Sequence, residues 1–418
     1  MNSKPPLGIA EDGPAIEVPT EVRYKYKIPI PIDSERRTVT FYPTSGNSEY
    51  QQNQTVKFNL AGNYADMANS YIAFSVYRTV ADPAECRSAH TFFRTVEVVE
   101  TATGRTIENL TDYSTLYHAM ARHSSHENYN PYEDAGNIGA IVIPQDAGGV
   151  SHIAGSFAIQ PFTGLLRSKL YLPLKWMSGG LEIRLLIDTD QNSVECGAAP
   201  GLRFVNFRYI VDMISLDSNF DTALGQWLSM SPLNQLNIPF ETFTSHNADG
   251  NQARPSMTIT QQVRSLKAFY AVRRLAAAFA QANDTFDFPQ ADIESFELRI
   301  GSQQHPNFIV PAGPVMYNEL MKSLGHLMDA QLINTVTIEL NQAGALGEYV
   351  GHSYLMGVNL ERHTHDELFM MTGISTFTYS PILFTLHIGA AAPSTITAFL
   401  HFDGILGVNF TGQCVIEY

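Results

Sequence analysis

Short segments in which apolar and polar side chains alternate at every second position recur along this chain of 418 residues. The alternation is explicit in residues 55–60, 181–185, 296–300, 335–340 and 384–388. Because the side chains of a β-strand point alternately to its two faces, each segment predicts a strand with one buried and one solvated face. Turn residues separate the segments, so we predict an all-β chain folded as sandwiches or barrels.

Only two stretches have the periodicity of a helix. Their apolar residues fall at positions i, i+3, i+4 and i+7. They are Tyr113, Leu116, Tyr117 and Met120 in the first stretch and Tyr317, Leu320, Met321 and Leu324 in the second. The two stretches begin 204 residues apart (317 − 113), which is close to half of the chain. Each follows a predicted strand and a polar connection, so the pair indicates an internal duplication.

Further similarities keep the same order in the two halves. They are Ala73-Phe74 with Ala268-Phe269, Thr163-Gly164-Leu165 with Thr372-Gly373-Ile374, and the strands that begin at Val205 and Ala398. The offsets of 195, 209 and 193 residues differ by amounts that loop insertions produce. The alternative is that sandwich strands look alike because period-two patterns are repetitive by nature.

The composition excludes several classes of protein. Hydrophobic residues make up 44% of the chain and charged residues 16%, as in ordered globular proteins. The net charge is −15 and Lys and Arg are nowhere clustered, so we expect no direct or sequence-specific binding of nucleic acid. The three cysteines, Cys86, Cys196 and Cys414, are far apart and form no CxxC pair. They favour a reducing compartment over a disulfide framework or a zinc ribbon.

The N-terminal region differs from the rest of the chain. Residues 1–23 are Pro-rich and acidic without apolar periodicity, and we expect an extended arm there. Because they contain no apolar run, we expect no secretion through a signal peptide. Residues 368–402 lack Asp, Glu, Lys and Arg, but Pro381, Gly389 and Pro393 interrupt them. That stretch therefore predicts two or three buried strands and not a membrane span.

Two parts of the sequence resemble the double jelly-roll major capsid proteins of tailless icosahedral DNA viruses. They read TGLLRSKLYLPLKWMSGGLEIRLLID at 163–188 and FELRIGSQQHP at 296–306, followed by YNELMKSLG at 317–325. This lineage includes polinton-like viruses, virophages and the PRD1–adenovirus group. The resemblance implies two tandem eight-stranded jelly-roll β-sandwiches with one short helix inserted in each. It also implies that three chains form a pseudo-hexagonal homotrimer, the capsomer that tiles an icosahedral virion shell.

The resemblance also suggests a division of the chain and a set of partners. We expect an extended arm at 1–23, a first jelly roll at 24–232 and a second at 233–418. The expected partner is the chain itself, first in the trimer and then between trimers. Penton proteins, minor capsid proteins and an internal membrane are further candidates. The expected localisation is the capsid of the virion, after synthesis in the cytoplasm or nucleus of the host cell.

Two histidine clusters contain side chains of the types that bind metals. They are His118, His123 and His126 with Glu127, and His363 and His365 with Asp366 and Glu367. The first cluster lies at a predicted helix end, where His caps carbonyls, and lacks the HExxH order of a zinc site. The second has no distant partner at a recognisable spacing. We therefore predict a helix end and a solvated loop, and no metal site.

No motif points to catalysis. The chain has no GxSxG elbow and no phosphate-binding loop, so we expect no enzyme, no catalytic or cofactor-binding residues and no cofactor. The paired arginines Arg36-Arg37 and Arg273-Arg274 are predicted to be solvated or locally paired at the surface, with contact to a neighbouring subunit as the alternative. Aromatic residues that alternate along strands are predicted to be core, among them Phe204, Phe207 and Tyr209.

Two rival hypotheses stay open. The first is a capsid protein with one jelly roll and a projecting domain, but such proteins usually have a basic arm and residues 1–23 are not basic. The second is a glycan-acting or glycan-binding protein built on tandem jelly rolls. That protein would be expected to have a signal peptide, paired cysteines and convergent carboxylates, and only a structure can test for the last of these.

Overall fold

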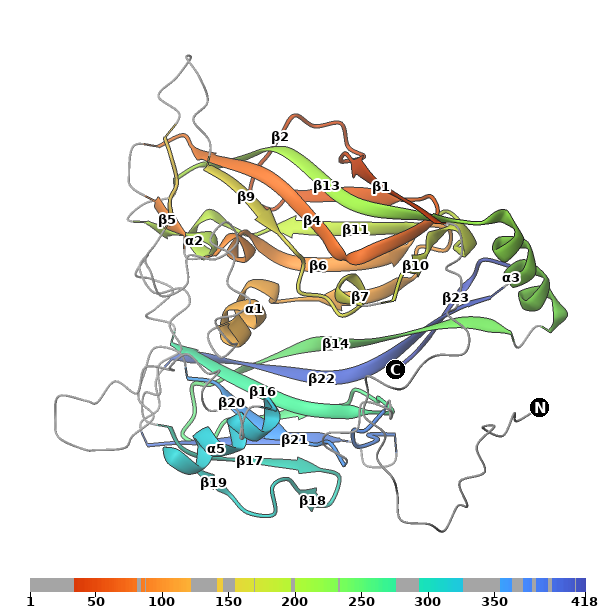
Figure 1. The fold of residues 1–418 in the computed structure, drawn as a ribbon. Helices are drawn as coiled ribbons and strands as arrows, with labels where there is room; N and C mark the ends of the chain where they lie inside the picture. The colour runs from red at the N-terminus through yellow and green to blue at the C-terminus, as the bar shows by residue number, and fades with distance from the viewer. Residues whose placement is uncertain are drawn as a thin grey trace, which may run out of the picture.

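Two β-sandwiches lie one against the other in the computed structural model (Figure 1). The structure describes residues 34–80, 84–86, 88–121, 141–145, 155–168, 170–196, 200–231, 234–275, 293–325, 354–362, 371–377, 381–389, 393–409 and 411–418. The predicted arm at 1–23 lies outside these residues.

The N-terminal sandwich consists of two facing sheets. One contains β1 (Ser34–Phe41), β13 (Leu202–Leu216) and β4 (Tyr64–Arg78), with β2 (Glu49–Tyr50) on β13 and with β9 (Gly155–Ile159) and β10 (Leu172–Pro173) on β4. The other contains β3 (Thr55–Leu60), β11 (Leu181–Ile187), β6 (Phe93–Glu100) and β7 (Thr106–Leu110). A small third sheet joins β12 (Glu195–Cys196), β5 (Ala84–Cys86) and β8 (Ile141–Val142).

The C-terminal sandwich repeats this plan. Its first sheet contains β14 (Gln235–Asp249), β22 (Ser394–Asn409), β16 (Leu266–Leu275) and β20 (Met356–Asn359), with β23 (Cys414–Glu417) on β22. Its second sheet contains β15 (Ser256–Ile259), β21 (Ile382–Ile388) and β17 (Ile293–Ile300), with β18 (Gln303–Gln304) and β19 (Val310–Pro311) on β17. The predicted strands within 368–402 are β21 and the first half of β22.

The two sandwiches share one connectivity. The order β1-β13-β4 corresponds to β14-β22-β16, and β3-β11-β6-β7 corresponds to β15-β21-β17-β19. The register agrees as well. Val96 pairs with Leu110, and the residues 200 positions later, Phe296 and Val310, pair with each other. The predicted all-β fold of two tandem jelly rolls is confirmed, and the common topology agrees with the predicted duplication.

Alternating burial explains why these sequences form strands. Every second residue of β11 is fully buried, namely Leu181, Ile183, Leu185 and Ile187. The three residues between them are partly exposed. Each buried aliphatic side chain contributes about 1.5–3 kcal/mol relative to an exposed one. The predicted core aromatics are confirmed: Phe204, Phe207 and Tyr209 are 0%, 3% and 0% exposed.

Both predicted helices are present, as α1 (Tyr113–Ala121) and α5 (Pro314–Ser323). The sequence analysis missed α3 (Ser218–Met230), which joins the two sandwiches after the N-cap Asp217. Only Leu228 of α3 is buried, so the helix has no wide apolar stripe that periodicity could detect. The remaining short helices of the described residues are α2 (Asp190–Ser193), η2 (Ala89–Phe92), η5 (Leu165–Arg167) and η6 (Leu174–Trp176). Of the helices in the described ranges, none has the length and apolarity to cross a membrane.

Candidate functional site: the seam between the jelly rolls

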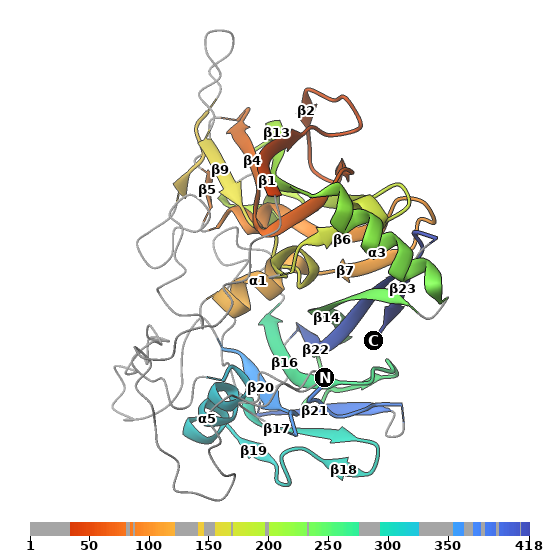
Figure 2. The same ribbon diagram turned by 45° about the vertical axis from the view of Figure 1, so that its right-hand side comes forward.

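Helix α1 lies between the two sandwiches in both views of the ribbon (Figures 1 and 2). We use the name seam for the contact of α1, β7 and the turn at residues 162–167 with β14, β16 and β22. Tyr113 at the start of α1 belongs to the core of the first jelly roll. The residues of the opposite side form a separate cluster with the second jelly roll, namely Leu116, Ala119 and Met120 with Ala268, Tyr270, Val272, Leu320, Leu355 and Phe399.

This contact buries β16 on both faces. Phe269 and Ala271 point into the core of the second jelly roll, whereas Ala268, Tyr270 and Val272 point toward α1. The three outward residues are only 2%, 3% and 0% exposed. A sheet with both faces covered by apolar groups cannot slide over its neighbour without exposing them to water. The apolar contact therefore fixes the two jelly rolls relative to each other.

Aromatic rings from both jelly rolls stack across the seam. The rings of Phe162 and Phe243 are stacked with centroids 5.7 Å apart, and Phe243 lies on His401 at 4.4 Å. The guanidinium of Arg167 lies 4.7 Å from the centroid of the Phe162 ring. Each aromatic pair contributes about 0.5–1.5 kcal/mol beyond its buried area. The stack therefore adds a specific orientation to the apolar contact.

A glycine permits the closest approach of the two chain segments. A Cβ on Gly164 would lie 1.5 Å from the carbonyl oxygen of Glu241, so no larger residue fits against β14. The amides of Gly164 and Leu165 donate to the carboxylate of Glu108 at 3.1 and 2.8 Å. Burial raises the pKa of Glu108 to about 7 despite these bonds and a hydrogen bond with Thr242 of β14. A buried, titratable carboxyl group thus holds the turn at the seam.

Charged side chains form a network beside the ring stack. Lys267 Nζ contacts Glu241 at 2.5 Å, Glu361 at 3.2 Å and Asp403 at 3.8 Å. The hydrogen bond from His401 Nε2, at 3.0 Å, and the Lys267 charge lower the pKa of Glu241 to about 2. Burial alone would lower the pKa of Lys267, but these carboxylates raise it to about 12. Glu241 and Lys267 are therefore both charged at neutral pH and form an ion pair beside the ring stack.

The C-terminal strand attaches the second jelly roll to the first at another point. Strand β23 pairs with β22, but Cys414 and Ile416 belong to the core of the first jelly roll. The amide of Cys414 donates to Glu100 at 3.0 Å, and Arg105 donates to the Cys414 carbonyl at 3.3 Å. The hydroxyl of Tyr418 donates to a carbonyl of β7. Strand β23 thus bridges the two sandwiches at the β6–β7 hairpin.

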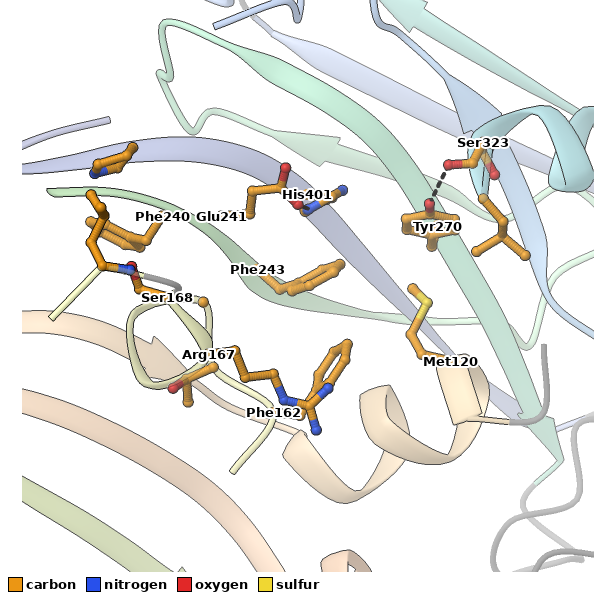
Figure 3. A pocket seen from close by; sticks show the side chains of 15 residues that line it. Met120, Phe162, Arg167, Ser168, Phe240, Glu241, Phe243, Tyr270, Ser323 and His401 are labelled. Carbon is orange, nitrogen blue, oxygen red and sulfur yellow. Dashed lines mark hydrogen bonds and ion pairs between the residues drawn. The ribbon is translucent and has the colours of Figure 1, made fainter. Parts of the chain in front are cut away.

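A cleft of about 650 Å³ opens along the seam (Figure 3). Phe162, Arg167, Phe243, Tyr270 and His401 are among the side chains that line it, and they come from both jelly rolls. The Tyr270 hydroxyl donates to the carbonyl of Ser323 at 2.8 Å. The cleft thus has mostly aromatic and aliphatic walls. Of its charged groups, Glu241 is paired with His401, and Arg167 donates to the carbonyls of Gln160 and Pro161.

The histidine clusters lie mostly outside the described residues. Of the first cluster the structure describes only His118, which is buried on α1 at 6% exposure. His123, His126, Glu127 and the whole cluster at residues 363–367 lie outside. Within the described part of the chain, no three His, Cys, Asp or Glu side chains are grouped closely enough to hold a metal ion.

The arginine prediction is right at one pair and wrong at the other. Arg36 is exposed and forms ion pairs with Asp66 and Asp212. Arg273 is not at the surface: it is 1% exposed, and its Nε donates to Ser394 Oγ at 3.1 Å. It is buried because β16 is an inner strand with both faces covered. Cys86 and Cys414 are buried free thiols.

Sequence reasoning missed the residues that hold the seam together. Glu108, Glu241 and His401 are far apart in the chain, and none belongs to a motif. Glu108 even breaks the alternation of β7, where Ile107 and Glu108 are both buried. A charged residue that interrupts the alternation of a strand is a signal in the sequence for a buried carboxyl group. It does not reveal which residues of the other jelly roll face that group.

Comparison with known proteins identifies the fold. No protein-family model matches the sequence, and a search of curated proteins found no match. The VP54 protein of PBCV-1, fitted into a reconstruction of the virophage Sputnik, is similar with a TM-score of 0.62 and 10% identity, over 94% of this chain and 99% of that one. The Faustovirus major capsid protein is similar with a TM-score of 0.62 and 6% identity, over 93% of each chain.

At such low identity these similarities establish the fold and nothing beyond it. The chain has the double jelly-roll fold of these viral major capsid proteins. The fold that the sequence resemblance predicted is thereby confirmed.

Proposed function

We propose that this chain is a major capsid protein and that three copies form a pseudo-hexagonal capsomer. The observation that supports this proposal most strongly is the seam, which joins two jelly rolls of the same topology into one rigid unit. Three such units around an axis place six similar jelly rolls in a ring. A six-sided ring tiles a flat face, and such faces close into an icosahedral shell.

The proposal also includes the localisation of the protein and its partners. Its localisation would be the virion, with further copies as the principal partner and with penton, minor capsid proteins or an inner membrane as additional ones. We keep the division into jelly rolls at 24–232 and 233–418, which is supported by α3 ending at Met230. Obligate subunit interfaces are large and apolar, so trimers of this kind should persist on dilution.

We further propose that the role is structural and not enzymatic. The polar groups around the cleft support this proposal, because Glu241 is occupied by Lys267 and His401, and His401 is stacked on Phe243. A catalytic carboxylate would need to reach a substrate. Here the carboxylate neutralises its neighbours and stabilises the seam.

The mass of the purified protein in solution tests the proposal. Light scattering over a range of concentrations should give about three times the chain mass of 46.3 kDa. Negative-stain images of the same fraction should show hexagonal outlines or closed shells. A folded protein that remains monomeric at the highest concentration would contradict the proposal and favour the glycan-acting alternative.

A further inference from the structure

Helix α3 lies at one end of the molecule and packs against the first jelly roll with one of its sides (Figure 1). On that side the carboxylate of Asp221 accepts from Lys175 Nζ at 2.5 Å. A Cβ on Gly225 would lie 2.9 Å from the ring of Trp176, and Leu228 is 1% exposed. These contacts fix which side of α3 faces the sandwich and therefore which side faces outward.

The outward side of α3 has a row of apolar side chains. The row is one side chain wide, and its members are three or four positions apart, namely Phe220, Ala223, Trp227 and Met230. Residues at that spacing lie one above another on a helix. Trp227 is 44% exposed and Met230 is 78% exposed. Contiguous exposed apolar groups are a mark of an interaction site, so the row indicates a binding surface.

The described part of the chain begins beside this helix. Ser34, the first residue of β1, pairs with Leu216 of β13, and α3 starts at Ser218. Because β1 and β13 are antiparallel, the chain that precedes Ser34 leaves the sheet on the side where β13 continues into α3. Residues 24–33 span about 33 Å when extended at roughly 3.3 Å per residue. The 13 residues of α3 span about 20 Å at roughly 1.5 Å per residue, so the preceding segment is long enough to follow the whole helix.

Residues 24–33, which lie outside the described ranges, have the sequence of an extended segment with one apolar side. Apolar residues occupy every second position, namely Tyr24, Tyr26, Ile28, Ile30 and Ile32. An extended chain places alternate side chains on the same side. Pro29 and Pro31 have no amide N–H, and each holds the residue before it in the extended region. The sequence therefore predicts an apolar ridge that packs through its side chains and not through a ladder of hydrogen bonds.

The charges of this segment are complementary to the far end of α3. The helix has no basic residue in its last turn, so the partial negative charge at its C-terminus is not neutralised by a side chain of its own. Counted back from Ser34 at roughly 3.3 Å per residue, Lys27 and Lys25 lie about 23 and 30 Å away, which is the distance to that end and just beyond it. Cations at a helix C-terminus are stabilising. The match favours a segment that runs antiparallel to α3.

A lipid surface is a poorer occupant of the row. Helices that bind in a membrane interface have Lys and Arg on their polar face. Between Ser218 and Met230 the sequence of α3 contains neither, and its one charged residue is Asp221. The basic segment that precedes β1 is the better match to this helix.

We propose that residues 24–33 lie along α3 of their own chain and cover its row of apolar side chains with Ile28, Ile30 and Ile32. The inference goes beyond the proposed function and does not depend on it, because the contact joins two parts of one chain. Helix α3 is the connection between the two jelly rolls. The segment before β1 therefore straps this connection, at a place distinct from the seam.

The first experiment measures the exposure of Trp227 in the full-length protein. The chain has two tryptophans, and Trp176 beneath α3 contributes the same background to every variant. Ile28→Asp with Ile30→Asp should displace the segment, because two carboxylates would otherwise be buried on the apolar row. Acrylamide should then quench the tryptophan fluorescence more strongly than in the native chain, and the emission should shift to longer wavelength.

Ile16→Asp with Val18→Asp is the matched control, because it makes the same two changes at the same spacing in the preceding arm. The control should give the quenching and the emission of the native chain. Native values in the Ile28–Ile30 variant, or an equal change in both variants, overturn the inference.

The second experiment detects the contact directly and does not depend on disrupting it. A full-length chain with Ile30→Cys and Ala223→Cys is treated with a short bis-maleimide reagent and separated on a denaturing gel. Mass spectrometry should find the two introduced cysteines joined in the band of one chain mass, 46.3 kDa. Each single-cysteine variant controls for the native thiols, of which Cys86 and Cys414 are buried.

The mass of the cross-linked band distinguishes the possible occupants of the row. If the two cysteines are joined only in a band of two chain masses, a neighbouring copy supplies the segment and the inference is wrong. If they are not joined in either band, the segment does not lie on α3 and the inference is equally wrong. Neither result bears on the capsomer proposal, which depends on the mass of the native chain by light scattering.

Discussion

Replacement of Glu108 by Gln tests whether the carboxyl group at the seam is buried as the structure has it. Burial raises the pKa of Glu108 from 4.5 to about 7. Between those values the folded state keeps a proton that the unfolded state has released, so the stability falls as the pH rises. The difference of roughly 2.5 between the two pKa values corresponds to about 3 kcal/mol of unfolding free energy. This contribution is fully present below pH 4.5 and is lost by about pH 7.

The assay is urea denaturation of the native chain and of Glu108→Gln at several pH values from 4.5 to 8. The difference in unfolding free energy between the two proteins isolates this carboxyl group from the other titrating groups. It should change by about 3 kcal/mol in favour of Gln as the pH rises, and level off above pH 7. Glu35→Gln, at an exposed residue of β1, is the control for the substitution itself. A flat difference for Glu108→Gln would refute the reasoning.

Two further substitutions probe the seam. Gly164→Ala should destabilise the chain by about 1–3 kcal/mol, because its Cβ would lie 1.5 Å from the carbonyl oxygen of Glu241. Gly155→Ala is the control and should be nearly neutral, because the atom nearest to its Cβ would be an ordinary 3.4 Å away. Equal melting temperatures for the two variants would contradict the close approach. Leu116→Ala should lower the unfolding free energy by about 2–5 kcal/mol, because it leaves a cavity between the jelly rolls. Thermal unfolding of this variant should then show two separated transitions. A single unshifted transition would show that α1 does not couple the two jelly rolls.

The sequence was most informative where a pattern depends on neighbours in the chain. Period two in β11 and the helical spacing from Tyr113 each reflect a face that one element buries by itself. Helix α3 escaped detection because it buries only Leu228. Arg273 was assigned to the surface because charged residues are usually exposed, yet its strand is enclosed by tertiary contacts that leave no local signature.

The seam could not be predicted because its contacts join residues far apart in the chain. Gly164 meets Glu241 and Glu108 meets Thr242, and neither pair shares a periodic pattern. The duplication gave the number of jelly rolls, but it could not show which face of one packs on which face of the other. That choice is made by side chains such as Met120 and Tyr270, whose fit appears only in three dimensions.

The bridge made by β23 has a consequence for the order of events during synthesis. Strand β23 follows every other strand of the described residues, and yet its Cys414 and Ile416 complete the core of the jelly roll that is made first. During translation the N-terminal sandwich can fold early, but part of its apolar surface stays open until residues 412–418 leave the ribosome. An unfinished chain therefore keeps the β6–β7 hairpin exposed. Completion of the second jelly roll and closure of the first become a single, late step.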